Sequence, residues 1–194
     1  MVTPKLYDPV SVLMLDFVGF TDMAASRDPV VTVSELNDIY SAFDRIGEQY
    51  GCERIKTIGD AYIAVSGLPE PMPDHAQAVA NTAIRFVRYL ERRNEGHSNQ
   101  WLCRIGIATG SVVGSVVGIQ KYVYDVFGPA VNLASRLQGC SEPMEITTHK
   151  LLRDSLKEEF LVEAAGTEDL KGFGEQQLFK IRDGRVDIMM AGYQ

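Results

Sequence analysis

Two aspartates stand where strands of a sheet are expected to end. Asp16 closes the apolar run of residues 10–17, and Asp60 follows Gly59 between two short β-rich runs. If these strands are neighbours, the two carboxylates meet at one edge of the sheet. They then form the oxygen-rich pair that Mg²⁺ bound to a triphosphate requires. The spacing alone fits two ordinary turn residues equally well.

A glycine loop and a helical pair suggest how phosphates would be held. In the run Gly19-Phe20-Thr21 the glycine lets the backbone approach a phosphate, and successive N–H groups can cradle it. Asn132 and Arg136 are four residues apart on a predicted helix, so they share one face. Arginine offers a bidentate fork to phosphate oxygens. Neither signal is specific alone, because such loops occur in many turns and such pairs on many solvated helices.

The hydrophobic pattern predicts the elements that position these residues. The order is β-α-β-β-α-β, which is the split βαβ arrangement. We therefore expect an α+β fold with a ferredoxin-like βαββαβ sheet, helices on one face and a C-terminal β/α extension. In chain order the predicted elements are a strand at 10–17, a helix at 30–50 capped by Gly51, a hairpin at 54–65, a helix from Asp74 to Leu90, strands at 101–109 and 111–118 turned at Gly110-Ser111, a helix at 129–138, a strand at 144–147, a helix at 148–158 and short strands in the tail.

Length and composition describe one ordinary soluble domain over residues 1–194. The chain is 45% apolar and 23% charged, and its net charge of −7 argues against a nucleic-acid partner. The three cysteines are far apart and form no C-x-x-C pair, which favours a reducing, cytoplasmic compartment. Neither a signal-peptide pattern nor an apolar run of about 18 residues is present, so we expect no membrane contact from this domain.

Five segments, spanning about residues 10–182, carry these polar residues. The strings are Asp16-Phe-Val-Gly-Phe-Thr21, Ile55-Lys-Thr-Ile-Gly-Asp60-Ala-Tyr, Arg104-Ile-Gly-Ile-Ala-Thr-Gly110, Tyr124-Asp-Val-Phe-Gly-Pro-Ala-Val-Asn132-Leu-Ala-Ser-Arg136 and, more weakly, Leu170-Lys-Gly-Phe-Gly174. Together they resemble the class III adenylyl and guanylyl cyclase catalytic domain. One such string would be weak, but all five occur in the family's order and at its approximate spacing.

The resemblance implies a metal site and phosphate contacts. Two Mg²⁺ or Mn²⁺ ions per active site would be bound by Asp16, Asp60 and the backbone carbonyl of Phe17. Arg104 and Lys171 look like the contacts to the terminal phosphates. Phe17 and Phe127 occupy positions where aliphatic residues or Trp are common in the family, but both stay apolar and we expect only packing changes.

The resemblance also implies that the site is shared between two chains. Asn132 would orient the ribose, and Arg136 would contact the reacting phosphate. In the family one domain supplies the metal aspartates and the arginine at the position of Arg104. The other domain supplies the residues at the positions of Lys56, Asp125, Asn132, Arg136 and Lys171. Because this chain holds both sets, we expect a homodimer with two complete sites. The resemblance also implies a sensor or regulatory domain in a longer parent protein.

Lys56 and Asp125 occupy the family's two base-reading positions. Adenylyl cyclases carry Lys with Asp or Thr there, whereas guanylyl cyclases typically carry Glu and Cys. An ammonium can donate to adenine N1 and a carboxylate can accept from the N6 amino group, while guanine has the reverse pattern. The resemblance therefore implies conversion of ATP to 3′,5′-cyclic AMP and pyrophosphate. Without it, the pair would read as an exposed strand lysine and a loop aspartate.

Other functions fit the sequence less well. A guanylyl cyclase is the nearest rival, and Lys56 with Asp125 speaks against it. A diguanylate cyclase shares the type of fold, but the chain has no Gly-Gly-Asp/Glu-Glu-Phe run. A degenerate cyclase acting as a nucleotide-sensing or dimerisation module should lack some of the polar residues, and all are present. A structural ferredoxin-like module explains the apolar pattern only.

Overall fold

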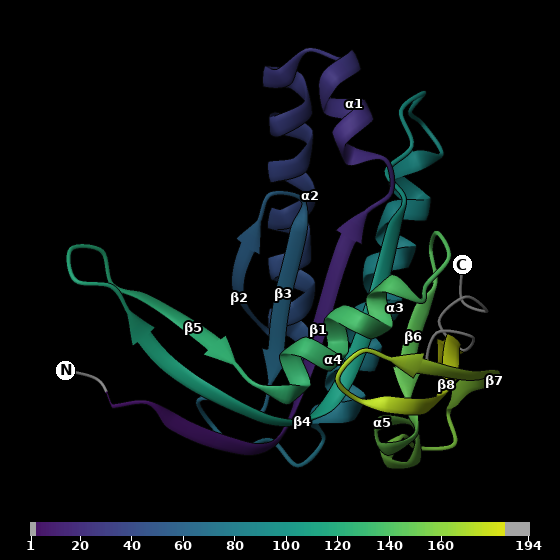
Figure 1. Cartoon of the computed structure of the whole chain (residues 1–194). Helices are drawn as coiled ribbons and strands as arrows, with labels where there is room; N and C mark the ends of the chain where they lie inside the picture. The colour runs from purple at the N-terminus through teal and green to yellow at the C-terminus, as the bar shows by residue number, and fades with distance from the viewer. Residues whose placement is uncertain (1–2, 185–194) are drawn as a thin grey trace.

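The computed structural model describes residues 3–184, and its centre is an eight-stranded sheet (Figure 1). The strands follow the order β2-β3-β1-β4-β6-β8-β7, and β5 pairs with β4 beside this path. The antiparallel set β2-β3-β1-β4 is the ferredoxin-like sheet, so the predicted fold class is confirmed. The strands are β1 (Lys5–Phe17), β2 (Glu53–Ile58), β3 (Ala61–Ser66), β4 (Cys103–Val117), β5 (Val123–Phe127), β6 (Ile146–His149), β7 (Phe160–Leu170) and β8 (Gly174–Gly184).

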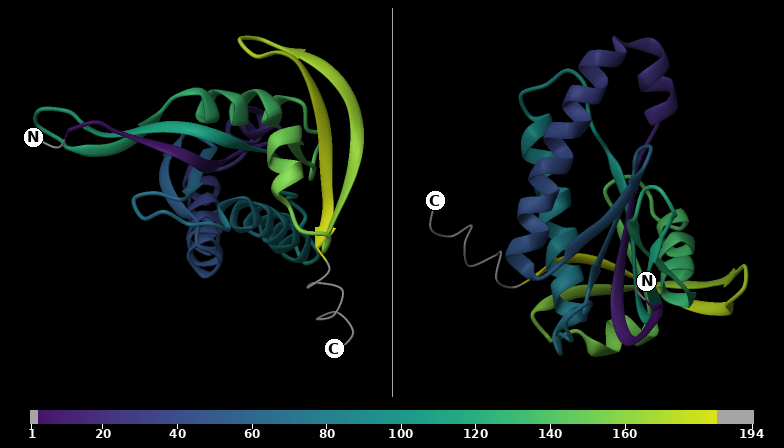
Figure 2. Two further views of the ribbon diagram at one scale, coloured as in Figure 1. Left: turned by 90° about the horizontal axis from the view of Figure 1, so that it is seen from below. Right: turned by 90° about the vertical axis from the view of Figure 1, so that its left-hand side faces the viewer.

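Two long helices, α2 (Pro29–Tyr50) and α3 (His75–Asn94), cover one face of the sheet (Figure 2). Leu13 and Ile105 reach this face from the two central strands and are fully buried. Phe43 of α2 and Phe86 of α3 stack with ring centroids 3.9 Å apart. The apolar stripes read from the sequence therefore face the sheet and each other, as an amphipathic helix requires.

The ends of these helices are defined by local chemistry. The Asp28 side chain accepts from the N–H of Val30 at 2.8 Å and starts α2. Gly51 ends it with φ of 85°, as predicted. Asp74 precedes α3 as expected, although its side chain makes no capping hydrogen bond. No helix in residues 3–184 is long and apolar enough to cross a membrane.

The short helix α4 (Pro129–Gly139) covers the opposite face, so the helices-on-one-face arrangement holds for α2 and α3 only (Figure 2). Leu137 packs there in a second core with Val12. Gly106 permits this contact, because a Cβ at that position would collide with the Ala134 carbonyl and the Gln138 nitrogen. The helix is thus held directly on the central strand β4.

The turn predicted at Gly110-Ser111 is wrong, because the 15-residue strand β4 continues through both residues. The glycine serves packing instead: a Cβ there would lie 3.4 Å from that of Ala130 in α4. The chain turns after β4, where Gly118 has φ of 113°, and returns as β5. Together β4 and β5 form an arm that extends away from the helices (Figure 1).

Three other segments differ from the predicted pattern. Residues 20–26, which follow the first strand, form the helix α1 (Phe20–Ser26), which was not predicted. The helix expected at 148–158 is the shorter α5 (Lys150–Ser155). The tail forms one long hairpin of β7 and β8, in place of several short strands. This hairpin joins the sheet through pairing of β8 with β6.

His149, at the end of β6, makes the fold sensitive to acid. It is buried, its Nε2 accepts from the N–H of Thr109 at 3.0 Å, and burial lowers its pKa from 6.5 to about 4. An unfolded chain therefore takes up this proton first as the pH falls from 6.5 to 4. The resulting loss of unfolding free energy is on the order of 3 kcal/mol. This loss of unfolding free energy is complete below about pH 4 and absent above about pH 6.5.

We expect His149→Gln to lose less stability on acidification than the unchanged protein, since an amide oxygen can accept the same N–H without titrating. Denaturant unfolding at pH 7.5 and pH 4.5 measures the difference. Other titrating groups cancel in the comparison. Equal losses of unfolding free energy in the two proteins would contradict this role for His149.

Candidate active site

The two aspartates meet at the end of β1, as expected. Leu15 of β1 pairs with Tyr62 of β3, and this register places the tip of the β2–β3 hairpin beside Phe17. The N–H of Phe17 donates to Oδ2 of Asp60 at 3.2 Å. Asp16 and Asp60 therefore lie close together at one edge of the sheet, although 44 positions separate them in the sequence.

Asp16 is in an environment that disfavours its charge. Its pKa is raised above 3.8 by burial and then by the neighbouring charge of Asp60, while Arg104 and Gln138 act in the opposite direction. Arg104 lies directly opposite Asp16 in the β1–β4 register. The Oδ1 atom of Asp16 is buried without a hydrogen-bond partner, which is costly unless something else pairs with it.

A divalent cation fits this pair of carboxylates. It would give Oδ1 of Asp16 its missing partner and offset the repulsion from Asp60. Within residues 3–184 no group of three or more His, Cys, Asp or Glu side chains could hold a metal ion. Mg²⁺ takes few protein carboxylates and completes its shell with phosphate oxygens and water, so two aspartates are a sufficient protein contribution.

Aromatic side chains support the segments that carry Asp16 and Asp60. Phe17 packs edge-on against Trp101 with ring centroids 5.1 Å apart. The Tyr40 hydroxyl donates to the Gly59 carbonyl at 3.4 Å and steadies the hairpin tip that carries Asp60. Sequence reasoning gave Trp101 and Tyr40 no part in the site. A usable signal was that Trp101 is the one tryptophan of the chain and lies two residues before the start of the central strand β4.

The glycine loop lies shortly after Asp16 in the sequence. Gly19 has φ of 66°, a left-handed conformation that favours glycine, and it is the N-cap of α1. Phe20 and Thr21 form the start of that helix; the Phe20 ring lies 6.1 Å from that of Trp101, and Thr21 is exposed. The loop is thus anchored on one side and open to solvent on the other.

Lys56 and Asp125 form a direct ion pair across two strands. Lys56 Nζ lies 2.7 Å from Asp125 Oδ2, joining β2 to β5 over 69 positions. Their side chains are 28% and 15% exposed, so the pair is partly desolvated yet reachable. The other oxygen, Oδ1 of Asp125, accepts from the N–H of Val126 at 2.7 Å, which fixes the orientation of the carboxylate.

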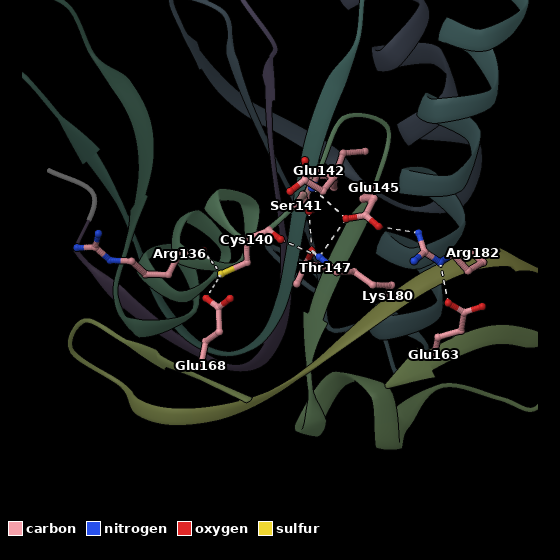
Figure 3. Close-up of polar contacts among 11 residues, drawn as sticks. Arg136, Cys140, Ser141, Glu142, Glu145, Thr147, Glu163, Glu168, Lys180 and Arg182 are labelled. Carbon is pink, nitrogen blue, oxygen red and sulfur yellow. Dashed lines mark hydrogen bonds and ion pairs between the residues drawn. The ribbon is translucent and has the colours of Figure 1, made fainter. Parts of the chain in front are cut away.

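A hollow of about 680 Å³ gathers three more of the predicted residues. Asn132, Arg136 and Lys171 are all exposed, and the Arg136 guanidinium points away from the residues at the end of α4 (Figure 3). The lining residues come from α4, from its N-cap and from the turn of the β7–β8 hairpin: Gly128, Pro129, Asn132, Ser135, Arg136, Lys171, Gly172 and Phe173.

One chain therefore presents two groups of residues. Asp16, Asp60 and Arg104 lie together at the end of β1. That end of the strand is on the side of α1 (Figure 1). The hollow lies beside α4, whose first turn directly follows β5 and its Asp125. The charges that act on Asp16 are those of Asp60 and Arg104. Neither group alone contains both the aspartate pair and the Lys56–Asp125 ion pair.

Comparison with known proteins shows to which family this chain belongs. The family model of the adenylate and guanylate cyclase catalytic domain matches residues 2–183. The chain is 41% identical over 168 residues to an adenylate cyclase of Mycobacterium tuberculosis, covering 87% of this chain and 38% of that protein. It thus spans well under half the length of this relative.

Solved structures agree with the sequence matches. The guanylate cyclase domain of RhGC from Catenaria anguillulae, solved in complex with GTP, has a TM-score of 0.88 and 27% identity, over 93% of this chain and 99% of that one. The adenylyl cyclase CyaB from P. aeruginosa has a TM-score of 0.88 and 25% identity, over 96% and 99%. The fold, the two residue groups and these matches lead to one conclusion: the chain belongs to the adenylate and guanylate cyclase catalytic domain family.

Proposed function

We propose that this chain is an adenylate cyclase domain, which converts ATP to 3′,5′-cyclic AMP and pyrophosphate in a homodimer. The observation that carries the proposal is the separation of two groups on one chain. A buried carboxylate pair lies at the end of β1, and a Lys–Asp pair with the Asn132 and Arg136 hollow lies beside α4. Two copies related by a twofold axis would bring one group of each kind together twice.

The metal pair and its neighbours would hold the triphosphate. Asp16, Asp60 and the Phe17 carbonyl would bind two Mg²⁺ or Mn²⁺ ions, which when bound lower the pKa of the ribose 3′-hydroxyl and hold the phosphates. The backbone of Gly19, Phe20 and Thr21 would face phosphate oxygens.

Arginine and lysine would neutralise the terminal phosphates. Arg104, half-buried beside Asp16, belongs to the metal group, whereas Lys171 is exposed at the hairpin turn and would reach the phosphates from the other chain. Each donates hydrogen bonds to oxygen and accepts none, as phosphate contacts require.

The α4 residues would act on the reacting atoms. The 3′-oxygen attacks the α-phosphorus, a P–O bond forms, and the bond to the leaving pyrophosphate breaks. Arg136 would offset charge that builds on the phosphoryl oxygens. Asn132 would hold the ribose so that its 3′-oxygen lies in line with the breaking bond. Both side chains are exposed in the single chain and free to meet a nucleotide.

Adenine fits the ion pair better than guanine does. Lys56 uses one of its donors on Asp125 and keeps others for adenine N1, while Asp125 can accept from the N6 amino group. Guanine would present O6 to the carboxylate and N1–H to the ammonium, leaving like groups facing each other. Each unsatisfied buried polar group costs about 1–3 kcal/mol, enough to favour ATP over GTP.

The β4–β5 arm supports pairing of two chains. Its exposed apolar side chains include Ile119, which is 90% exposed, together with Tyr122, Val123 and Phe127. Such a group on a projecting hairpin is a feature of interaction surfaces. The longer relatives support a sensor or regulatory domain in a longer parent protein. A reducing, cytoplasmic setting suits three free thiols.

The experiment is product analysis with ATP and with GTP, in Mg²⁺ and in Mn²⁺, over a series of protein concentrations. We expect cyclic AMP as the main product, and activity per chain that rises with concentration as dimers form. Cyclic GTP as the main product would instead favour a guanylyl cyclase, and absence of both would favour a nucleotide-sensing module.

Base choice is tested by the double variant Lys56→Glu with Asp125→Cys. We expect its kcat/KM for ATP to fall by about a hundredfold, because both contacts to adenine are lost, and the ratio of GTP to ATP use to rise. The matched control is Lys150→Glu with Asp154→Cys, which alters an exposed pair on α5 with a separation of 2.6 Å. ATP turnover that stays unchanged in the first variant would remove these residues from base recognition.

A further inference from the structure

The C-terminal end of α4 is bound by a lysine from a distant strand. The last carbonyls of a helix lack partners within the helix and need donors from elsewhere. Here the carbonyl of Cys140, the residue that ends α4, accepts from Nζ of Lys180 at 2.7 Å (Figure 3). Lys180 lies on β8, and a cation at this end of a helix also complements the helix dipole.

Lys180 is mostly buried and its donors are used. Its side chain is 12% exposed, and Nζ also donates to Oγ1 of Thr147 at 2.8 Å and pairs with Glu145 at 3.2 Å. Burying a charge is costly unless it is paired and hydrogen-bonded. Three protein oxygens surround this ammonium, which has three donors, so its position is fixed.

The same partners fix the turn that follows α4. Ser141 donates to the Ile105 carbonyl at 2.7 Å and shares a hydrogen bond of 2.6 Å with Thr147. The N–H of Glu142 donates to Glu145 at 2.9 Å. Lys180 therefore lies at the centre of a network that connects α4 to β4, β6 and β8 (Figure 3).

This network also fixes α4 relative to the β7–β8 hairpin. Lys180 belongs to that hairpin, and the Cys140 thiol contacts Glu168 of β7 at 3.3 Å. The turn of the hairpin carries Lys171, which lines the hollow together with Arg136 and Asn132. The distance across the hollow therefore depends on how the hairpin and the end of α4 are joined.

We propose that Lys180 is a positioning residue for catalysis, which holds α4 so that Asn132 and Arg136 meet the transition state. The inference rests on the proposed function, because it assigns these residues their roles. A small shift of α4 would misalign groups that act mainly in the transition state. We therefore expect a larger change in kcat, which should fall, than in KM.

The main variant is Lys180→Met, which keeps the apolar stem and removes the donors. We expect kcat for ATP to fall by about tenfold or more, with KM within about threefold. The amide protons of Cys140 and Ser141, which are bonded to Leu137 and Gln138 carbonyls, should exchange faster. Lys180→Arg, which keeps a charged donor, should recover most of kcat.

Arg182→Met is the matched control. Arg182 lies on the same strand and pairs with the same Glu145 at 2.8 Å and with Glu163 of β7 at 3.1 Å, and neither of these partners belongs to α4. We expect near-normal kcat and near-normal exchange at Cys140 and Ser141. Should Lys180→Met fail to fold, Lys180→Gln takes its place under the same criteria.

Two results would overturn the inference: unchanged kcat in Lys180→Met, or equal loss of kcat in the lysine and arginine variants. If the unchanged protein makes no cyclic nucleotide, the proposed function fails and the catalytic part of the inference falls with it. Amide exchange then still decides whether Lys180 holds α4: faster exchange in Lys180→Met than in Arg182→Met supports the hold, and equal exchange refutes it.

Discussion

Asp16→Asn should reduce cyclic AMP formation on the order of a thousandfold or more, because a neutral amide is a poor ligand for a cation that neutralises phosphate charge. The loss should appear in kcat at saturating Mn²⁺ and ATP. The same substitution leaves the size of the side chain unchanged. Asp38→Asn, on the exposed surface of α2, is the control and should retain full activity.

The same variant should be more stable than the unchanged protein when no metal is present. The folded state raises the pKa of Asp16 through burial and through Asp60, so ionisation of Asp16 near neutral pH opposes folding. The stability associated with the protonated form is present at low pH and lost as the pH rises through the folded pKa. An asparagine cannot ionise and avoids this loss.

Thermal melting with and without Mn²⁺ measures both effects. Without metal, Asp16→Asn should melt at a higher temperature than the unchanged protein. With Mn²⁺ and a non-reacting ATP analogue, the unchanged protein should gain stability by ligand binding and the variant should gain little. A variant that retains activity, or one that melts lower without metal, would contradict the role given to Asp16.

Features that depend on neighbouring residues could be predicted from the sequence. The helix at 30–50 follows from its 3.6-residue apolar spacing and from Gly51, whose backbone suits a helix end. The hairpin around Gly59 and Asp60 follows from two β-rich runs and a turn pair. The order of these elements then gave the ferredoxin-like sheet.

Features that depend on tertiary packing could not be predicted from the sequence. Gly110 is a residue type that is typical of turns, yet here it permits the close contact of β4 with Ala130. No local sequence pattern distinguishes these two uses of a glycine. The placement of α4 on the opposite face follows from Gly106, which matters only once a helix lies on it. The short α1 has no fully buried residue, and only Phe20 and Met23 pack partly against the core, which is too few to show a helical period.

The candidate site likewise has residues that the sequence predicted and a residue that it did not. The polar residues were found because motif strings carry them, and the structure brings Lys56 to Asp125 and gathers Asn132, Arg136 and Lys171 around one hollow. Their roles in catalysis remain the proposal. Lys180 had no motif; the only sequence signal was a charge between the buried residues Phe179 and Ile181. Its partners are Cys140 at the end of α4, Glu145 and Thr147, which are all far away in the sequence.

The central claim is that each active site takes its metal pair from one chain and its α4 residues from the other. Mixing Asp16→Ala chains with Arg136→Ala chains tests it. In a heterodimer one site carries both defects and the other carries none. Random pairing of equal amounts makes half the dimers mixed, each with one intact site, so we expect about a quarter of the normal activity.

A matched mixture shows whether recovery depends on the sharing of sites. Asp16→Ala with Asp60→Ala places both defects in the metal group, so every site in the mixed dimer lacks one aspartate and activity should stay near zero. Two affinity tags would confirm that mixed dimers form. Recovery to about a quarter in the first mixture and none in the second is the predicted result. No recovery in the first mixture, with mixed dimers confirmed, would contradict a site shared between two chains.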